Sequence, residues 1–482
     1  MVMAVHNPGH EIDDIQRALA RYASAFSIAA LPAATVHEAK IRVIDTLGAL
    51  VGGFNDEPCR LARELAADFP MANGATVIGT TLRTSMDFAA FVNGTTARSA
   101  EINDVYHHPG SKNGHPSDVI APLLAVAEQS HASGGDFLAS VVLAYEIYLR
   151  FADAFQSRAF DATNFCSIGT AIAAAKLLHL SEAQIAQAIA MAVVPNNALN
   201  QTRTGHLTMW KSLAAGQAGR AGIFAALLAQ KGMHGPNLPF TGKHGWCANI
   251  AGKPLSLGRL GILNEWGGGD NVFKIHDTTI KPRMACLHTL APILAAEKAA
   301  AQLKEGIDPI ERVTVEVYKA NERAIASIEK SGGAVDHHWS PDSRETADHS
   351  IPYCVAATLF DGSVTTQSFD DAHLHNPDLR ALLLKIELVE NRDFTAAYEK
   401  IPVHYRSRVT VRLQNGKQLV GETGAEHGDL SDPKSNEDIA TKFGYFAEPV
   451  FGAQRVSQML DHLWNIDAAM DVSAVPALFV IG

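Results

Sequence analysis

Hydrophobic residues change their spacing along this chain near residue 280. Before that point they recur at helical spacing in one segment after another, and Val36–Val51, followed by Gly52–Gly53 as a plausible stop, is an example. Beyond it, Ile310–Val317 (IERVTVEV) alternates apolar and polar residues, as a half-buried strand does. The change predicts two parts of different structural class.

The second part also carries a hairpin signal. Arg408–Val420 consists of two alternating runs joined around Asn415–Gly416, a pair typical of a tight turn between strands. Helical patterns lie between the strands, as in Asn376–Ile386, and return from Ser435 onward, as in Ala453–Leu463. We therefore predict a mainly α protein, in which a large all-helical domain carries a smaller inserted α/β lid.

Chain length agrees with two domains, because 482 residues exceed what one hydrophobic core usually supports. The predicted divisions are a helical domain over residues 1–278, the lid over 279–427, and C-terminal helices over 428–482 that rejoin the first domain. Ser181 and Gln184 resemble a capping box, and Pro195 ends the helix that follows. Ile172–Leu178 and Ala214–Gln230 are rich in alanine and glycine, which suits either close helix packing or simple helix propensity.

Charge and hydropathy exclude several classes of partner. The formal net charge of −11 argues against nucleic acid, which requires a basic surface. No uninterrupted apolar run of about 18 residues occurs, so we expect no membrane span, and the N-terminal residues lack the apolar core of a signal peptide. These features predict a cytoplasmic protein. An anionic substrate would need a local cluster of cations to overcome the overall negative field.

The cysteines give no sign of a metal centre. Their number is odd, they are scattered, and no CxxC pair occurs, which argues against a disulfide framework, a thiolate zinc site and an iron–sulfur cluster. We therefore predict neither a metal nor a cofactor. The cysteines are Cys59, Cys166, Cys247, Cys286 and Cys354.

The segment Glu101–Asp118 (EINDVYHHPGSKNGHPSD) has the richest chemistry in the chain. It combines three carboxylates, three histidines and two prolines, so it cannot be a continuous helix. Histidines such as His115 exchange protons near neutral pH and are candidate acids or bases. A plain solvated loop and a metal site remain open, although the spacings match no standard ligand motif.

Two further segments could contribute to a binding site in the helical part. Asp161 precedes a helix of small residues, where it could cap the helix or orient a His or Lys. Lys211 lies at the start of an Ala/Gly helix that looks buried, so its charge needs a partner, a ligand or an exposed position. Arg203 nearby could bind a carboxylate in bidentate fashion.

Two more segments lie at or beyond the predicted domain junction. Lys281, Arg283 and His288 form a basic group there, and clefts between domains often bind small molecules; an ordinary basic helix start is the alternative. In Thr346–Tyr353 (TADHSIPY), His349 and Tyr353 are possible polar contacts, and a plain loop is equally compatible.

Together these segments resemble the MmgE/PrpD family over nearly the whole chain. The family includes 2-methylcitrate dehydratase, cis-aconitate decarboxylase and iminodisuccinate epimerase. The resemblance lies in the order and coverage of many short pieces, each weak alone. They are residues 44–48 (IDTLG), 75–79 (ATVIG), 93–95 (NGT), Asn103-Asp104 leading to 115–118 (HPSD), 211–216 (KSLAAG), Lys281-Pro282 with His288, and 348–353 (DHSIPY).

The resemblance implies a helical domain with an α/β lid, a homodimer, no required cofactor, and a site between the two domains. The stretch WKSLAAG is similar to the RKSWAAG of the dehydratase branch, and Asp161 and His288 also fit that branch. Glu101 replaces a common Asp, Val105 replaces a Thr, and Ala162 replaces a frequent His, so the substrate is the least determined part of the prediction.

From these residues we expect a cofactor-free dehydratase of a small hydroxy-polycarboxylate such as 2-methylcitrate. His115 and His288 are the expected acid/base pair, with Asp104 or Asp161 fixing a tautomer. Positive charge must stabilise the carbanion next to a carboxylate. Decarboxylation or epimerisation of a related acid, and a catalytically silent binding protein, are the alternatives. Lys211, Lys281 and Arg203 are the expected cations, and His107, Tyr353 and Glu101 complete the expected substrate contacts.

Overall fold

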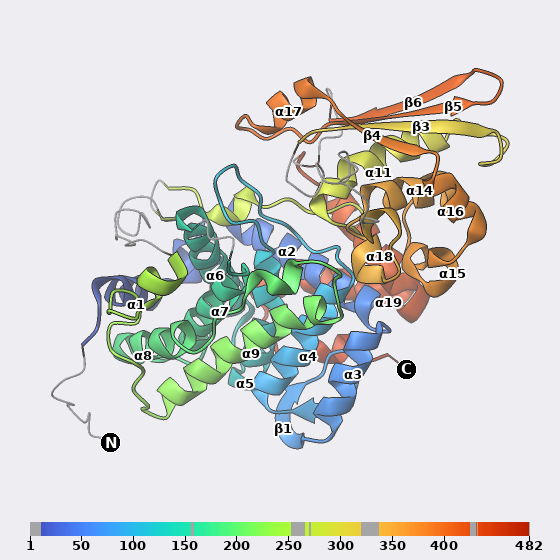
Figure 1. Ribbon diagram of the computed structural model, residues 1–482. Coiled ribbons are helices and arrows are strands. Elements are labelled where there is room, and N and C mark those ends of the chain that lie inside the picture. The colour runs from blue at the N-terminus through green and yellow to red at the C-terminus, as the bar shows by residue number, and fades with distance from the viewer. Residues whose placement is uncertain are drawn as a thin grey trace.

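The computed structural model describes residues 11–155, 159–251, 266–268, 271–319, 337–424, 430 and 432–481. Figure 1 shows a large group of packed helices and, beside it, a smaller unit in which helices pack against one sheet. The predicted fold class, mainly helical with a sheet-containing lid, is confirmed. The predicted division at 427/428 lies outside the described residues.

The N-terminal part is built from helices that extend the sequence patterns by a few residues. One departure from the all-helical prediction is a short antiparallel hairpin, β1 (Pro70–Thr76) with β2 (Arg83–Thr84). Pro70 and Gly74 interrupt any alternating pattern there, so the strand carries no periodic signal. The helices are α1 (Asp14–Ala25), α2 (Ala33–Gly53), α3 (Glu57–Ala67), α4 (Met86–Ser99), α5 (Ile120–Ser130), α6 (Gly134–Ala154), α7 (Thr163–Leu177), α8 (Glu182–Val193) and α9 (Trp210–Gln230).

Small residues let the central helices touch backbone to backbone. A Cβ on Gly216 of α9 would lie 2.3 Å from the Phe91 carbonyl oxygen of α4, and one on Gly222 would lie 2.6 Å from the Ser167 carbonyl oxygen of α7. These distances are too short for any side chain, so glycine is required at both crossings. Of the two explanations for the Ala/Gly content, the structure supports close packing. The α4–α9 crossing places the end of α4 near the start of α9.

The lid contains one mixed sheet of order β4-β3-β5-β6. Strand β3 (Ile310–Val317) pairs parallel with β4 (Ile386–Glu390) and antiparallel with β5 (Ser407–Leu413), and β5 pairs with β6 (Gln418–Thr423). The predicted strand and hairpin are confirmed, with Gly416 in the turn at φ 82°. The predicted helix to Ile386 is too long, since that residue begins β4. The lid helices are α11 (Leu287–Ala300), α13 (Arg344–Ala347), α14 (Ile351–Asp361), α15 (Asp371–Leu374), α16 (Pro377–Leu383) and α17 (Arg392–Tyr398).

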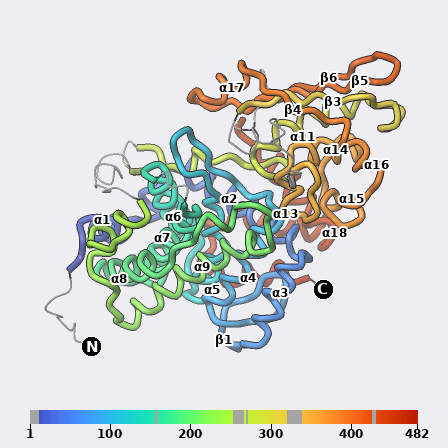
Figure 2. Tube along the Cα trace, viewed as in Figure 1, coloured from blue at the N-terminus to red at the C-terminus, as the bar shows by residue number. Residues whose placement is uncertain are grey.

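The chain returns from the lid to the helical part through α18 (Asn436–Phe451) and α19 (Ala453–Trp464). Helix α18 packs against α2, where Phe443 fills the space that a Cβ on Gly48 would occupy. Figure 2 shows this C-terminal segment, in red, close to the blue N-terminal helices. Within the residues that the structure describes, no helix is long and apolar enough to cross a membrane.

Candidate active site

A cavity of about 690 Å³ lies where the lid meets the helical part. The segment 101–118 forms much of its wall, the start of α7 and Arg203 form another part, and the lid contributes the start of α11, His349 and the end of α17. Cations, carboxylates, imidazoles and a phenol therefore surround one space. Such a convergence of polar groups in a concave site is typical of small-molecule binding.

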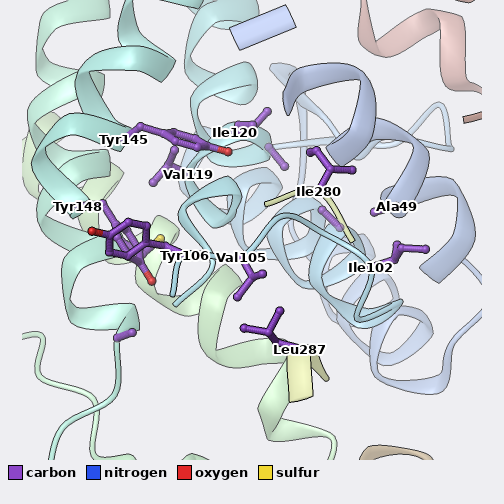
Figure 3. Packing of buried hydrophobic residues seen from close by; sticks show 14 of the residues in the cluster. Ala49, Ile102, Val105, Tyr106, Val119, Ile120, Tyr145, Tyr148, Ile280 and Leu287 are labelled. Carbon is purple, nitrogen blue, oxygen red and sulfur yellow. The ribbon is translucent and has the colours of Figure 1, made fainter. Parts of the chain in front are cut away.

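The two ends of the segment 101–118 are anchored in the hydrophobic interior. Ile102, Val105 and Tyr106 are buried and pack into the main hydrophobic cluster, where Figure 3 shows them together with Tyr148 and Leu287. The polar residues between them are buried as well, since Asn103 and Asp104 are at most 1% exposed. The plain-loop interpretation therefore does not hold for the two ends of the segment, whereas residues 107–113 between them are half-buried or exposed.

Glu101 is the centre of a buried charge cluster. Its backbone adopts φ 52°, a left-handed conformation that L-residues rarely adopt. Its carboxylate lies 2.6 Å from Lys281 Nζ, 3.2 Å from Lys211 Nζ and 2.5 Å from an Arg98 guanidinium nitrogen. Burial alone would raise the pKa of Glu101, but these three cations outweigh it and hold that pKa well below its ordinary value. Glu101 is therefore an ionised acceptor at neutral pH.

Lys211 connects this cluster to the lid. Its ammonium donates hydrogen bonds to both carboxylate oxygens of Asp348, at 3.0 and 2.9 Å, and lies 3.4 Å from His349 Nδ1. The Asp348 carboxylate also contacts His349 Nδ1 directly. Burial and the Lys211 charge lower the pKa of His349, but Asp348 and the Cys286 thiol outweigh them and raise it above its ordinary value.

His115 has the opposite electrostatic environment. Its Nδ1 lies 2.8 Å from the Asp104 carbonyl oxygen, so Nδ1 carries the proton and Nε2 keeps its lone pair. Nε2 lies 3.8 Å from Glu101 Oε1, at the cavity wall. Burial, together with the charges of Arg98 and Lys281, holds the pKa of His115 well below its ordinary value. The cavity thus contains His115, which favours the neutral form, and His349, which favours the charged form.

The two aspartates predicted to fix a histidine tautomer have other partners. The Asp104 carboxylate accepts hydrogen bonds from the Tyr145 hydroxyl and the Ser117 N–H, and only its backbone carbonyl reaches His115. Asp161 accepts a hydrogen bond of 2.8 Å from Arg203 Nε. Burial would raise the pKa of Asp161, but Arg203 outweighs burial and lowers it. Asp104 therefore fixes the His115 tautomer through its backbone carbonyl and not through its carboxylate, and Asp161 contributes to the cavity wall without contacting an imidazole.

Histidines and tyrosines form the wall where the loop meets α17. The Tyr398 hydroxyl lies 2.6 Å from His107 Nε2, and the Tyr405 hydroxyl lies 3.2 Å from His107 Nδ1. His288 lies near the Tyr318 hydroxyl, at 3.3 Å, and its ring centroid is 5.7 Å from that of His107. Burial lowers the pKa of His107 to about 4, so this imidazole is neutral at physiological pH.

The structure brings most of the predicted site residues together. Asp104, Lys211, Lys281 and Tyr353 are buried behind the wall, and the Tyr353 hydroxyl donates to the Ser368 carbonyl oxygen inside the lid, away from the cavity. The residues that line the cavity as predicted are Glu101, His107, His115, Asp161, Arg203 and His288. Within the described residues, no group of three or more His, Cys, Asp or Glu side chains is arranged to hold a metal ion.

Several lining residues were not predicted as site residues. Asp118 and Cys286 belong to segments that the sequence had indicated, and His349 was considered only as a polar contact. Burial raises the pKa of the Asp118 carboxyl to about 7, although Arg98 and Arg203 oppose the shift. From the sequence, these three residues could be identified only by their membership of segments rich in polar side chains. Their roles depend on residues from distant parts of the chain.

Comparison with known proteins gives the site a context. Residues 17–257 match the MmgE/PrpD N-terminal domain, and residues 284–466 match the MmgE/PrpD C-terminal domain. The chain is 25% identical to the human cis-aconitate decarboxylase, over 92% of this chain and 90% of that protein. It is 26% identical to the mitochondrial 2-methylcitrate dehydratase of Yarrowia lipolytica, over 79% and 74%, and to the 2-methylcitrate dehydratase of Salmonella typhimurium, over 80% of each chain.

Proposed function

The chain belongs to the MmgE/PrpD family, whose relatives include dehydratases and decarboxylases, and from that premise we propose that it dehydrates a small hydroxy-polycarboxylate such as 2-methylcitrate. The reaction takes a proton from the carbon next to a carboxylate and expels the hydroxyl group as water. It therefore needs a base and an acid on one bound substrate. The chain is about equally identical to the decarboxylases and to the dehydratases. The choice between the two reactions therefore depends on the chemistry of the cavity.

The observation that carries this proposal is the pair of imidazoles with opposite pKa shifts. The pKa of His115 is lowered and that of His349 is raised, so at neutral pH the first favours the neutral form, which can accept a proton, and the second favours the charged form, which carries a proton to donate. Two titratable groups pushed apart in this way are typical of an acid/base pair. Decarboxylation needs a proton donor for the carbanion but no base at that carbon, so the pair favours dehydration.

In the proposed mechanism, His115 Nε2 removes the proton and His349 protonates the departing hydroxyl group. His349 replaces His288 as the acid, because it contacts the Asp348 carboxylate and His288 lies beside a neutral tyrosine. His288 and His107 are then substrate contacts at the α17 side. After each turnover His115 releases the proton it took and His349 takes one up from solvent, and the Asp348 carboxylate favours the charged form of His349.

Cations on the opposite wall are suited to binding the substrate carboxylates. Arg203 lines the cavity, and its guanidinium donates from Nε to the Asp161 carboxylate and from a terminal nitrogen to the Lys211 carbonyl oxygen, which fixes a positive charge at the wall. Lys112 also lines the cavity, with its ammonium 3.4 Å from the neutral Asn200 Oδ1. Lys211 and Lys281 lie behind the wall, where they hold Glu101 ionised and add positive charge near the developing carbanion.

The first test follows ultraviolet absorbance of chelator-treated protein with racemic 2-methylcitrate. We expect the absorbance of a conjugated alkene to rise, and His115→Ala to lower turnover on the order of 10²–10⁴-fold. His349→Gln should lower it as well, whereas His462→Ala, an exposed residue on α19, should change nothing. A loss below about tenfold in folded His115→Ala would exclude His115 as the base.

The same preparation separates the alternative reactions. Carbon dioxide released from cis-aconitate would indicate decarboxylation, the activity named for the human relative. Exchange of a substrate proton for deuterium without net elimination would indicate epimerisation. Calorimetric binding of these acids with no turnover would indicate a silent binding protein. We also propose a homodimer on the family resemblance, which light scattering of the purified chain tests directly.

A further inference from the structure

Cys286 occupies a distinctive position at the cavity wall. It is the N-cap residue of α11, its backbone N–H donates to the Asp348 carbonyl oxygen at 2.9 Å, and its side chain is partly exposed to the cavity. Leu287, the first residue of α11, lines the same cavity. The positive end of a helix dipole at this position stabilises both a thiolate and a bound anion.

A histidine and an aspartate stand behind this thiol. Cys286 and His349 line the same cavity, and the backbone hydrogen bond from Cys286 to Asp348 holds the two side chains in neighbouring positions. The Asp348 carboxylate contacts His349 Nδ1. This arrangement is the one that activates a nucleophile, because the base takes the thiol proton and the carboxylate stabilises the resulting imidazolium. Burial would raise the pKa of Cys286, but the charge of His349 outweighs burial, and the pKa is lowered.

The remaining cysteines provide an internal comparison. Cys59, Cys166 and Cys354 are buried, and burial raises the pKa of each. Cys247 is buried as well. A reagent that requires a thiolate and access should therefore distinguish Cys286 from the other four.

We propose that Cys286 is a nucleophile that forms a covalent adduct with α,β-unsaturated polycarboxylates in the cavity. The thiolate sulfur attacks the β-carbon and forms the S–C bond, while the π electrons of the alkene move to the α-carbon. His349, as the imidazolium, delivers its proton to that carbon and becomes neutral. The step consumes one alkene and one thiol and needs no further reactant. Unsaturated acids that resemble the dehydration product would thus inactivate the enzyme by occupying its own site.

The first experiment measures alkylation of the folded protein by iodoacetamide, with each cysteine followed by peptide mass spectrometry. A free thiol is only a few per cent ionised at pH 7, so we expect Cys286 to react about tenfold faster than glutathione there and to keep its rate as pH falls toward 6. His349→Gln should return that pH profile to the one of an ordinary thiol. Reaction of Cys286 no faster than Cys59 or Cys354 would overturn the proposal.

The second experiment incubates the protein with maleate, a small unsaturated dicarboxylate. We expect one maleate per chain, mapped to Cys286, and none in Cys286→Ser, whose fold is checked by its thermal midpoint. Cys354→Ser, on the neighbouring α14, is the matched control and should be modified like the wild type. If iodoacetamide labels Cys286 but maleate adds nowhere, conjugate addition is wrong even though the thiol is reactive.

The proposed adduct rests on the proposed polycarboxylate substrate class. A protection experiment tests the adduct and the substrate class separately. 2-Methylcitrate should slow iodoacetamide labelling of Cys286 by occupying the cavity. Protection without a maleate adduct would remove the covalent step and leave the substrate class intact. A maleate adduct without protection by 2-methylcitrate would support the nucleophile and count against the proposed substrate.

Discussion

Lys281 and Glu101 join the two parts of the chain through a fully buried ion pair. The Lys281 ammonium is 2.6 Å from Glu101 Oε1 and donates further hydrogen bonds to the backbone carbonyl oxygens of Glu101 and Ala285, at 2.9 and 3.1 Å. Lys281 is 0% exposed. All three hydrogens of the ammonium therefore have acceptors, which is the condition under which a buried charge is tolerated.

Lys281→Met should destabilise the protein strongly. It leaves the buried Glu101 short of one of its cations, and breaking one partner of a buried pair costs about 3–5 kcal/mol. The measurement is the urea midpoint, followed by circular dichroism and by activity. Glu101→Gln in the same chain should restore part of the loss, because it removes the uncompensated charge.

The matched control for this prediction is Arg312→Gln on β3, whose partner Glu387 is also exposed. Surface pairs contribute about 0–1 kcal/mol, so its midpoint should stay close to that of the wild type. Equal midpoints for Lys281→Met and Arg312→Gln would show that the buried pair makes no special contribution.

Helices and strands with a clear period could be predicted from sequence, and those without one could not. Ile310–Val317 alternates and forms β3 as expected. Ile386–Glu390 is short and directly follows a helical pattern, so the predicted helix includes its first residue and the strand itself is not predicted. Its identity as a strand depends on parallel pairing with β3, a contact between distant segments that local spacing does not report.

The site shows the same division between local and distant information. The loop 101–118 could be found from its histidines and prolines, and Lys211 from the unusual position of a lysine in an apolar helix. The partner of Lys211 could not be found, because Asp348 lies 137 positions away. Cys286 and His349 were likewise indicated only as members of their segments, since the cavity that brings them together forms between the start of α11 and the residues before α14.

The stability of Asp118 variants should depend on pH. The pKa of this carboxyl is raised to about 7 in the folded protein, from an ordinary value of 3.8, so folding favours its protonated form. That contribution to stability is complete below the unfolded pKa and is lost as pH rises through about 7. Asp118→Asn keeps a neutral group at all pH values, so its thermal midpoint should gain on that of the wild type between pH 5 and 7 and then level off.

Asp161→Asn is the comparison for this prediction, because Asp161 lines the same cavity but its pKa is shifted in the opposite direction. The pKa of Asp161 is lowered by Arg203 against the effect of burial, so its contribution is lost only in strongly acidic solution. Between pH 5 and 8 the midpoint difference between this variant and the wild type should stay constant. A constant difference for Asp118→Asn as well would contradict the raised pKa.

Gly114→Ala should displace His115 indirectly, through Tyr148. A Cβ at Gly114 would lie 2.2 Å from the Tyr148 hydroxyl oxygen, and Tyr148 is buried and unable to move freely. That hydroxyl accepts the His115 backbone N–H at 3.2 Å. We expect a loss of about 1–3 kcal/mol in stability from overpacking, and a lower kcat. Thermal melting and steady-state kinetics measure the two effects.

Gly135→Ala in α6 is the control, because its Cβ would meet Ile28 only at 3.4 Å, an ordinary contact. This substitution should leave kcat unchanged and stability unchanged or slightly higher. Equal changes in thermal midpoint and kcat for the two glycine variants would show that the contact with Tyr148 is not the cause.

Tyr398→Phe should weaken substrate binding while preserving the fold. The lost hydroxyl lies 2.6 Å from His107 Nε2 and connects α17 of the lid to the loop of the helical part. The ring itself stays stacked on Tyr318, with centroids 4.4 Å apart. One such hydrogen bond contributes about 0.5–1.5 kcal/mol, which corresponds to a rise of about two- to tenfold in Kd. Calorimetry with tricarballylate, which lacks a hydroxyl group to eliminate, measures that rise without turnover. Tyr445→Phe, an exposed position on α18, should bind like the wild type. Unchanged binding by Tyr398→Phe would mean that contact between α17 and His107 does not hold the lid over the substrate.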